Sequence, residues 1–179
     1  MKKYNLTNFD FSHNYLYFWD MFEKSNLFLE NMISTAGKPM DDRDVYYMFQ
    51  APVNDGGVWN LYYNLGEKYG VVPKEVMPET AHSNNTNAMV SLINERLRKG
   101  GYTIREMAAQ GKKAKDLRVE KISVLKDIYR ILALCLGEPP TTFTWRYKDK
   151  NGEIKELANY PPQQFYKEIT PADYSPENY

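Results

Sequence analysis

The first third of the chain is dominated by apolar residues at helical spacing. Ser12 is a good N-cap, and Gly37 and Pro39 end the apolar run that follows it. Because the apolar stripe is wide, we expect one long helix that is buried over much of its surface. The apolar positions are Tyr15, Leu16, Phe18, Trp19, Phe22, Leu29, Met32 and Ile33.

Two shorter helices are expected next. Asp41 and Asp42 cap a helix to about residue 50, and Pro52 breaks the pattern. The pair Gly56-Gly57 opens a third helix, which runs to about residue 68. Gly70 is placed to stop that helix in a left-handed C-terminal position.

The middle of the chain predicts a second helical region. A turn at residues 83–86 leads into a helix from about Asn87 to Lys99, which Gly100 and Gly101 are expected to end. A short helix around residues 103–109 follows, and then a long one from about 112 to 136. The long helix has a 3.6-residue apolar period at Leu117, Ile122, Leu125, Ile128, Leu132 and Leu136.

The pattern changes near the C-terminal end. Thr142–Tyr147 is β-branched and aromatic with alternation, Asn151-Gly152 is a strong hairpin signal, and residues 153–157 return. Pro161-Pro162 starts a last short helix at 163–168, and the polar tail 171–179 is expected to be loose. The predicted fold class is α+β, mostly helical with a C-terminal β-hairpin.

Composition narrows the function classes. Lys+Arg and Asp+Glu both number 23, so the net charge is zero, which argues against nucleic acid as a partner despite the basic patch Lys112, Lys113 and Lys115. The N-terminus lacks an apolar signal region, and no run approaches the ~18 apolar residues of a membrane span. We therefore expect a cytoplasmic location and no membrane partner.

Few residues suggest catalytic or metal chemistry. Cys135 is the single cysteine, and its apolar helical surroundings favour a buried structural role. His13 and His82 show no ligand spacing, so no metal and no cofactor is expected, although a Cys–His pair formed in space stays open. The pair Gly56-Gly57 fits either a plain loop-to-helix junction or a place where another backbone comes close.

Several collinear motifs cover nearly the whole chain. The motifs are Phe11–Asp20 (FSHNYLYFWD), Asn26–Glu30 (NLFLE), Pro52–Trp59 (PVNDGGVW), Glu67–Lys74 (EKYGVVPK), Met77–Thr80 (MPET), Ser83–Thr86 (SNNT), Leu136–Trp145 (LGEPPTTFTW) and Gln164–Tyr166 (QFY). Together they resemble one known family, the bleomycin hydrolase / aminopeptidase C family of papain-like cysteine peptidases.

The resemblance implies a role for the glycine pair. In such enzymes the second glycine of a Gly-Gly loop pairs, backbone to backbone, with a peptide substrate. That role falls on Gly57, with Gly56 and Asp55 shaping the loop and Val58 facing the adjacent side-chain pocket. The resemblance also implies a barrel-shaped homo-hexamer.

The same resemblance implies that the catalytic residues are missing. The family's nucleophilic Cys precedes the segment that resembles Phe11 onward, and its His and Asn follow the segment that resembles Gln164–Tyr166. Neither Cys135 nor either histidine matches them, so we expect this chain to carry substrate-binding residues but to be inactive alone. The expected partner is a peptide substrate, bound near its N-terminus by the intact enzyme.

The expected organisation is a single partial peptidase domain. Residues 1–80 correspond to the papain-like helical half without its nucleophile helix, 81–137 to a helical insertion, and 138–179 to the hairpin, a short helix and the tail. The leading hypothesis is a fragment of a cysteine-type aminopeptidase. The alternative is a non-catalytic oligomerisation or interaction module derived from that family.

Overall fold

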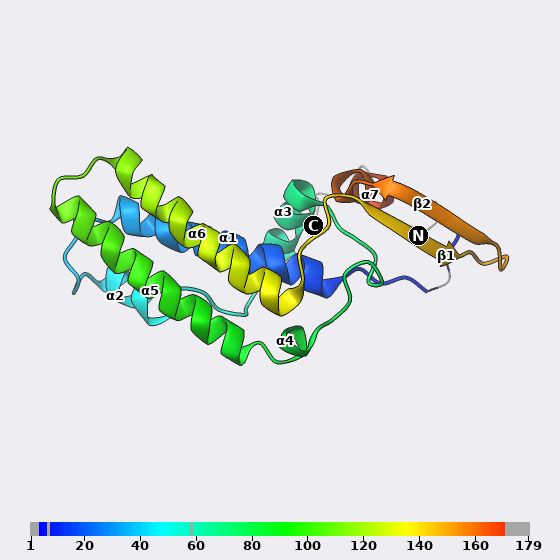
Figure 1. The fold of residues 1–179 in the computed structure, drawn as a ribbon, viewed down its shortest axis with the longest axis horizontal. Helices are drawn as coiled ribbons and strands as arrows, with labels where there is room; N and C mark the ends of the chain where they lie inside the picture. Colours follow the sequence, from blue (N-terminus) through cyan, green and yellow to red (C-terminus); the bar gives the residue numbers. More distant parts are fainter. Residues whose placement is uncertain (1–3, 7, 58, 171–179) are drawn as a thin grey trace. The chain divides into compact units, whose positions relative to one another are not determined.

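The structure is a computed structural model, and it describes residues 4–6, 8–57 and 59–170 (Figure 1). The chain divides into two compact units. The hairpin unit comprises Met1–Asp20, Gly56–Ser83 and Leu136–Tyr179. The helical unit comprises Met21–Asp55 and Asn84–Cys135, so each unit is assembled from segments that are far apart in sequence.

The helical unit is built from four helices. They are α1 (His13–Ser34), from Met21 onward, α2 (Arg43–Gln50), α5 (Asn87–Ala109) and most of α6 (Ala114–Leu136). Helices α5 and α6 are antiparallel neighbours joined by a short connection (Figure 1). Their apolar faces and those of α1 and α2 supply the core, in which Phe28, Leu29, Met32, Val45, Ile93, Leu97, Ile104, Leu117, Val124, Ile128 and Leu132 are buried.

The prediction that Gly100 and Gly101 end a helix is wrong. α5 runs without interruption from Asn87 to Ala109, so the two helices expected on either side of the glycine pair are one. A Cβ added at Gly100 would lie 2.7 Å from Val124 Cγ2, and one added at Gly101 would lie 3.2 Å from atoms of Phe28 and Met32. These glycines therefore let neighbouring helices approach closely, and their role is packing rather than termination.

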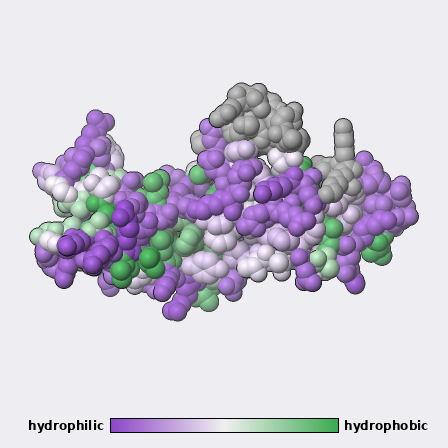
Figure 2. All heavy atoms as spheres, turned by 90° about the horizontal axis from the view of Figure 1, so that it is seen from above, coloured by the Kyte–Doolittle hydropathy of each residue, from purple (hydrophilic) through white to green (hydrophobic). Residues whose placement is uncertain are grey.

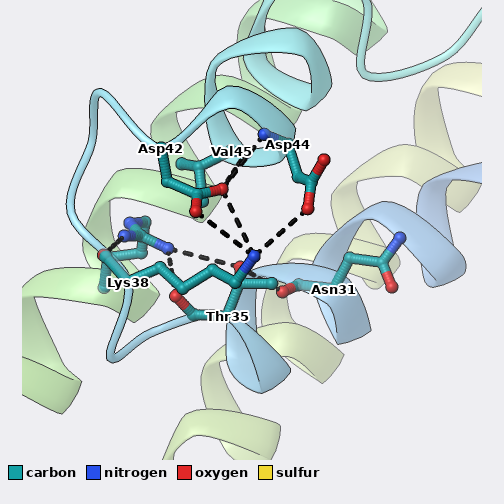
Figure 3. Close-up of polar contacts among 7 residues, drawn as sticks. Asn31, Thr35, Lys38, Asp42, Asp44 and Val45 are labelled. Carbon is teal, nitrogen blue, oxygen red and sulfur yellow. Dashed lines mark hydrogen bonds and ion pairs between the residues drawn. The ribbon is translucent and has the colours of Figure 1, made fainter.

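The connection between α1 and α2 is held by polar contacts (Figure 3). Asp42 is the N-cap of α2, and its carboxylate accepts hydrogen bonds from the backbone N–H groups of Asp44 and Val45 at 3.0 and 3.3 Å. Lys38 Nζ lies 3.3 Å from Asp42 Oδ2 and 3.1 Å from Asp44 Oδ2. The predicted capping role of Asp42 is confirmed.

The hairpin unit contains α3 (Trp59–Tyr69), α4 (Ala81–Asn84), α7 (Pro162–Ile169) and a two-stranded antiparallel sheet of β1 (Phe143–Lys148) and β2 (Ile154–Tyr160). The strand register pairs Phe143 with Tyr160 and Trp145 with Leu157, with a bulge between the two pairs. Buried aromatic and apolar side chains gather around α7 and β1: Tyr4, Leu6, Phe143, Trp145, Phe165 and Tyr166.

One carboxylate ties three segments of this unit together. Tyr4 donates a hydrogen bond to Glu168 Oε2 at 2.7 Å, and the Tyr160 hydroxyl donates to Glu168 Oε1. Burial, and then the Glu168 carboxylate, raise the pKa of Tyr4. Hydrogen bonds to Glu168 thus link helix α7 to the segment before α1 and to strand β2.

Most expected elements of the fold are confirmed. The long first helix, the helix capped by Asp42, the helix ended by Gly70 (φ 77°) and the hairpin turning at Gly152 (φ 85°) all form. The expected turn at 83–86 instead begins inside the short helix α4, because Ser83 and Thr80 hydrogen-bond to each other's backbone N–H groups and favour one helical turn there. The tail 171–179 lies outside the described residues, and the segment boundaries at 80/81 and 137/138 stay predictions.

Within the described part of the chain, no helix is both long and apolar enough to cross a membrane.

Candidate functional site

The candidate site is the loop Pro52–Gly57, which connects α2 to α3. Pro52 and Val53 are buried and anchor the loop, whereas the four residues Asn54, Asp55, Gly56 and Gly57 are exposed. Val58 lies outside the described residues, so its expected position beside a side-chain pocket stays a prediction.

The described surroundings of Gly57 do not require glycine, and the same holds for Gly37. A Cβ added at Gly57 would meet no atom within 4 Å, and its φ does not lie in the left-handed region. The contrast with Gly66 and Gly70 is sharp. A Cβ at Gly66 would lie 2.5 Å from Tyr166 Cε2, and Gly70 combines a φ of 77° with a backbone atom of Pro162 at 2.1 Å. Among the described residues, no atom fills the space beside the Gly57 Cα.

The first part of the loop, residues 53–55, is held by contacts within the helical unit. Val53 N–H donates to Asn94 Oδ1 at 3.0 Å, and Asn94 Nδ2 donates to Val53 C=O at 3.3 Å. Lys24 Nζ donates to Asn54 C=O at 3.0 Å, and Thr86 Oγ1 donates to Asp55 Oδ2 at 3.2 Å. The expected role of Asp55 in shaping the loop thus has one visible contact, to the N-cap residue of α5.

A small hollow of about 160 Å³ lies beside the first half of the loop. It is smaller than the ~300 Å³ at the lower limit for a small-molecule site, so we assign no ligand to it. Its lining residues are Lys24, Leu27, Phe28, Asn31, Met48, Ala51, Pro52, Val53 and Asn54.

The one cysteine is poorly suited to nucleophilic attack. Cys135 lies near the C-terminal end of α6 and is partly buried, which is less than its apolar sequence context predicts, because it stands between the exposed Leu134 and the buried Leu136. Burial raises the pKa of the Cys135 thiol, which lowers the thiolate fraction at neutral pH.

The two histidines show no catalytic arrangement of their own. The His13 side chain is exposed, with Nε2 3.5 Å from Asp10 Oδ1, and His82 lies in the short helix α4. Across residues 4–6, 8–57 and 59–170, no group of three or more His, Cys, Asp or Glu side chains is placed to hold a metal ion.

Comparison with known proteins identifies the family of this chain. The sequence model of the Peptidase C1-like family matches residues 1–178. The chain belongs to this family, and the predicted resemblance is confirmed.

Individual relatives are similar over nearly all of this chain. Aminopeptidase C of Lactobacillus delbrueckii subsp. lactis is 43% identical over 178 residues, which are 99% of this chain and 39% of that protein. Bleomycin hydrolase of Mus musculus is 39% identical over 170 residues, which are 94% of this chain and 37% of that protein. The chain thus spans less than two fifths of the length of these relatives.

A solved structure supports the fold. The crystal structure of PepW from Lactobacillus rhamnosis HN001 matches with a TM-score of 0.89 and 42% sequence identity. The match covers 93% of this chain and 37% of that one. The predicted fold class, mostly helical with a C-terminal β-hairpin, is confirmed.

Sequence reasoning missed the residues that hold the loop. Thr86, Asn94 and Lys24 carry no catalytic signature, and their contacts join positions 30 to 41 residues apart. One signal was present: Thr86 and Asn94 are eight residues apart, close to two helical turns, and so share a face of the helix predicted there.

Proposed function

We propose that this chain carries the substrate-binding Gly-Gly loop of a cysteine-type aminopeptidase and none of its catalytic residues. The loop Asp55–Gly57, together with Val58, binds the backbone of a peptide near its N-terminus. The catalytic Cys, His and Asn belong to parts of the enzyme to which no segment of this chain corresponds. Family membership supports the enzyme class, and the surroundings of Gly57 support the site.

The observation that carries the proposal is the open backbone at Gly57 within the motif Pro52–Trp59. Open space alone does not single out Gly57, because Gly37 has it too; Gly57 differs in lying in the motif that resembles the family's Gly-Gly loop. An extended peptide that pairs with the Gly57 N–H and C=O passes close over its Cα. A side chain there would hold the peptide away and weaken both hydrogen bonds.

The test is peptide affinity of the 179-residue chain, measured by calorimetry with an unblocked tetrapeptide of alanine and leucine. Gly57→Val is expected to weaken binding about tenfold or more, which corresponds to the loss of one or two backbone hydrogen bonds. Gly37→Val is the matched control, because Gly37 also has open space around its Cα and also lacks a left-handed φ. Equal affinity of Gly57→Val and the original chain would refute the role of Gly57.

The second candidate function is self-association through the helical unit. α6 presents Val119 and Ile122, one helical turn apart and 69% and 53% exposed, and Tyr102 of α5 is 51% exposed. Figure 2 shows apolar side chains among hydrophilic ones on the face it draws. These exposed side chains favour the homo-oligomer that family resemblance implies, with a hexamer as its expected form.

Light scattering during size exclusion tests this second proposal. Ile122→Lys is expected to shift an oligomer to monomer, while Ile154→Lys, on the exposed strand β2 of the hairpin unit, leaves the oligomer intact. A clean monomer for the original chain would contradict self-association.

A further inference from the structure

Helix α5 and its N-cap carry a row of polar side chains that bind a single segment of the chain, residues 35–55. The residues are Thr86, Asn94, Arg98 and Arg105, spaced by eight, four and seven positions, which places them along one face of α5 and its N-cap. Their partners, in the same order, are Asp55, Val53, the pair Phe49 and Gln50, and the pair Thr35 and Lys38.

The order of the partners gives the direction of the segment 35–55 relative to α5. As α5 proceeds from Thr86 to Arg105, its partners fall back in sequence from residue 55 to residue 35. The segment 35–55 therefore lies antiparallel to α5 within the helical unit. Three of the four α5 residues bind main-chain atoms, so they fix the position of the segment whatever side chains it carries.

The two arginines bind the ends of helices. Arg98 Nε donates to Phe49 C=O and Arg98 Nη2 donates to Gln50 C=O, each at 2.8 Å, at the C-terminal end of α2. Arg105 is 8% exposed and donates to the carbonyl oxygens of Thr35 and Lys38 just after α1. At the end of α2 the Arg98 guanidinium satisfies the carbonyl groups of Phe49 and Gln50, and its positive charge suits the C-terminal dipole.

Of the four residues, Asn94 binds the main-chain atoms that lie closest to the loop tip. Its side-chain amide both accepts from and donates to Val53, which fixes the orientation of Val53 as well as its position. Val53 is buried and precedes Gly57 by four residues, with the exposed Asn54–Gly56 between them. A loop that is fixed at its base loses less conformational freedom when a peptide binds to its tip.

We infer that Asn94 is a positioning residue for peptide binding, because it fixes Val53 at the base of the Gly-Gly loop within the helical unit. The inference rests on the proposed function of the Gly-Gly loop. It gives a role in substrate binding to α5, which lies in the segment that family resemblance identifies only as a helical insertion.

The experiment uses nitrogen-15 NMR on the 179-residue chain, with three variants. Asn94→Ala removes both contacts with Val53, Asn94→Asp keeps an oxygen to accept from Val53 N–H, and Glu95→Ala changes the neighbouring exposed residue of α5. Two quantities are measured: the hydrogen-exchange rate of the Val53 amide, and the affinity for the alanine and leucine tetrapeptide.

We expect the Val53 amide to exchange at least about tenfold faster in Asn94→Ala and to stay protected in Asn94→Asp and Glu95→Ala. Amides of Leu97 and Ile104 in the same helix keep their protection, which separates local release of the loop from general destabilisation. Peptide binding weakens several-fold in Asn94→Ala and stays unchanged in Glu95→Ala.

Unchanged Val53 exchange in Asn94→Ala would overturn the inference, as would unchanged affinity in that variant when the original chain binds the peptide. If the original chain binds no peptide, the proposed function fails together with the substrate role of Asn94. The exchange rates still decide in that case whether α5 fixes the loop. Should Asn94→Ala fail to fold, Arg98→Lys replaces it, because lysine cannot bridge both Phe49 and Gln50 as the guanidinium fork does.

Discussion

Gly100 of α5 lies directly against Val124 of α6, so close that a Cβ on Gly100 would come within 2.7 Å of Val124 Cγ2. Both residues are buried, and Val124 is fully so. The contact brings the two longest helices together at a point where no side chain fits between them. It explains why a residue that disfavours helices occupies the interior of one.

Gly100→Ala is expected to destabilise the chain by about 1–3 kcal/mol, because the added methyl forces Val124 or the helices apart. Urea unfolding followed by circular dichroism measures this. In a Val124→Ala background the same change becomes neutral or stabilises by up to ~1 kcal/mol, since the clash is gone and alanine favours the helix. A cost that stays the same in both backgrounds would contradict the contact.

The buried hydroxyl of Tyr15 is expected to make the stability of the fold depend on alkaline pH. Burial raises the pKa of Tyr15 to about 12, and its hydroxyl donates to Tyr69 C=O at 2.7 Å. Because the unfolded chain loses this proton near pH 10, the stability that Tyr15 contributes is fully present below pH ~10 and is lost between pH ~10 and 12. The loss is on the order of 2–3 kcal/mol.

Urea unfolding at pH 8 to 11.5 tests the Tyr15 prediction. Tyr15→Phe is expected to cost about 1 kcal/mol at pH 8, where the hydrogen bond is lost, and to give a flatter dependence on pH above 10. The exposed Tyr46 provides the control as Tyr46→Phe, which is expected to keep the slope of the original chain. If the free energy of unfolding of Tyr15→Phe falls as steeply with pH as that of the original chain, the loss of stability at alkaline pH comes from other groups.

The neighbouring aspartates 41 and 42 are expected to differ in their effect on stability. Asp42→Ala removes the cap of α2 and its ion pair with Lys38, and should lower the free energy of unfolding by about 1 kcal/mol. Asp41→Ala, at an exposed position one residue earlier, should change it by less than ~0.5 kcal/mol. Equal effects in thermal unfolding would contradict the assignment of Asp42 as the N-cap.

Cys135 gives a prediction for activity. With a fluorogenic aminoacyl substrate and a thiol reductant, the isolated chain should show no turnover above that of Cys135→Ala, because its thiol is partly buried and its pKa is raised. Thiol-dependent hydrolysis that Cys135→Ala abolishes would refute the claim that this chain carries no catalytic nucleophile.

The helices and the hairpin were predictable from sequence because their signals are local. Periodicity marked α1 and α6, Asp42 marked a helix start, and Gly152 marked the hairpin turn. Gly100 and Gly101 misled the prediction because the same residue serves to end a helix and to admit a neighbouring one. Only the position of Val124, 24 residues later, separates the two uses.

The candidate site was predictable only in part, for a similar reason. Family resemblance pointed to the loop at Gly57, but its support by Asn94 and Thr86 depends on contacts across 31 to 41 residues. In the sequence, Asn94 looks like an ordinary residue on the surface of a helix, and Thr86 looks like a helix cap. Because Asn94 binds backbone atoms, its contact leaves no complementary side-chain pattern at Val53.

The most direct measurement of the central claim is the amide signal of Gly57 during titration of the nitrogen-15-labelled chain with the unblocked tetrapeptide. The account predicts that the Gly57 amide shifts in a saturable manner with the same dissociation constant as calorimetry gives, while the Gly37 amide stays in place. It also predicts that Gly57→Val removes the saturable shifts of the neighbouring loop amides. A peptide that binds without moving the Gly57 amide, or that binds Gly57→Val equally well, would contradict the account.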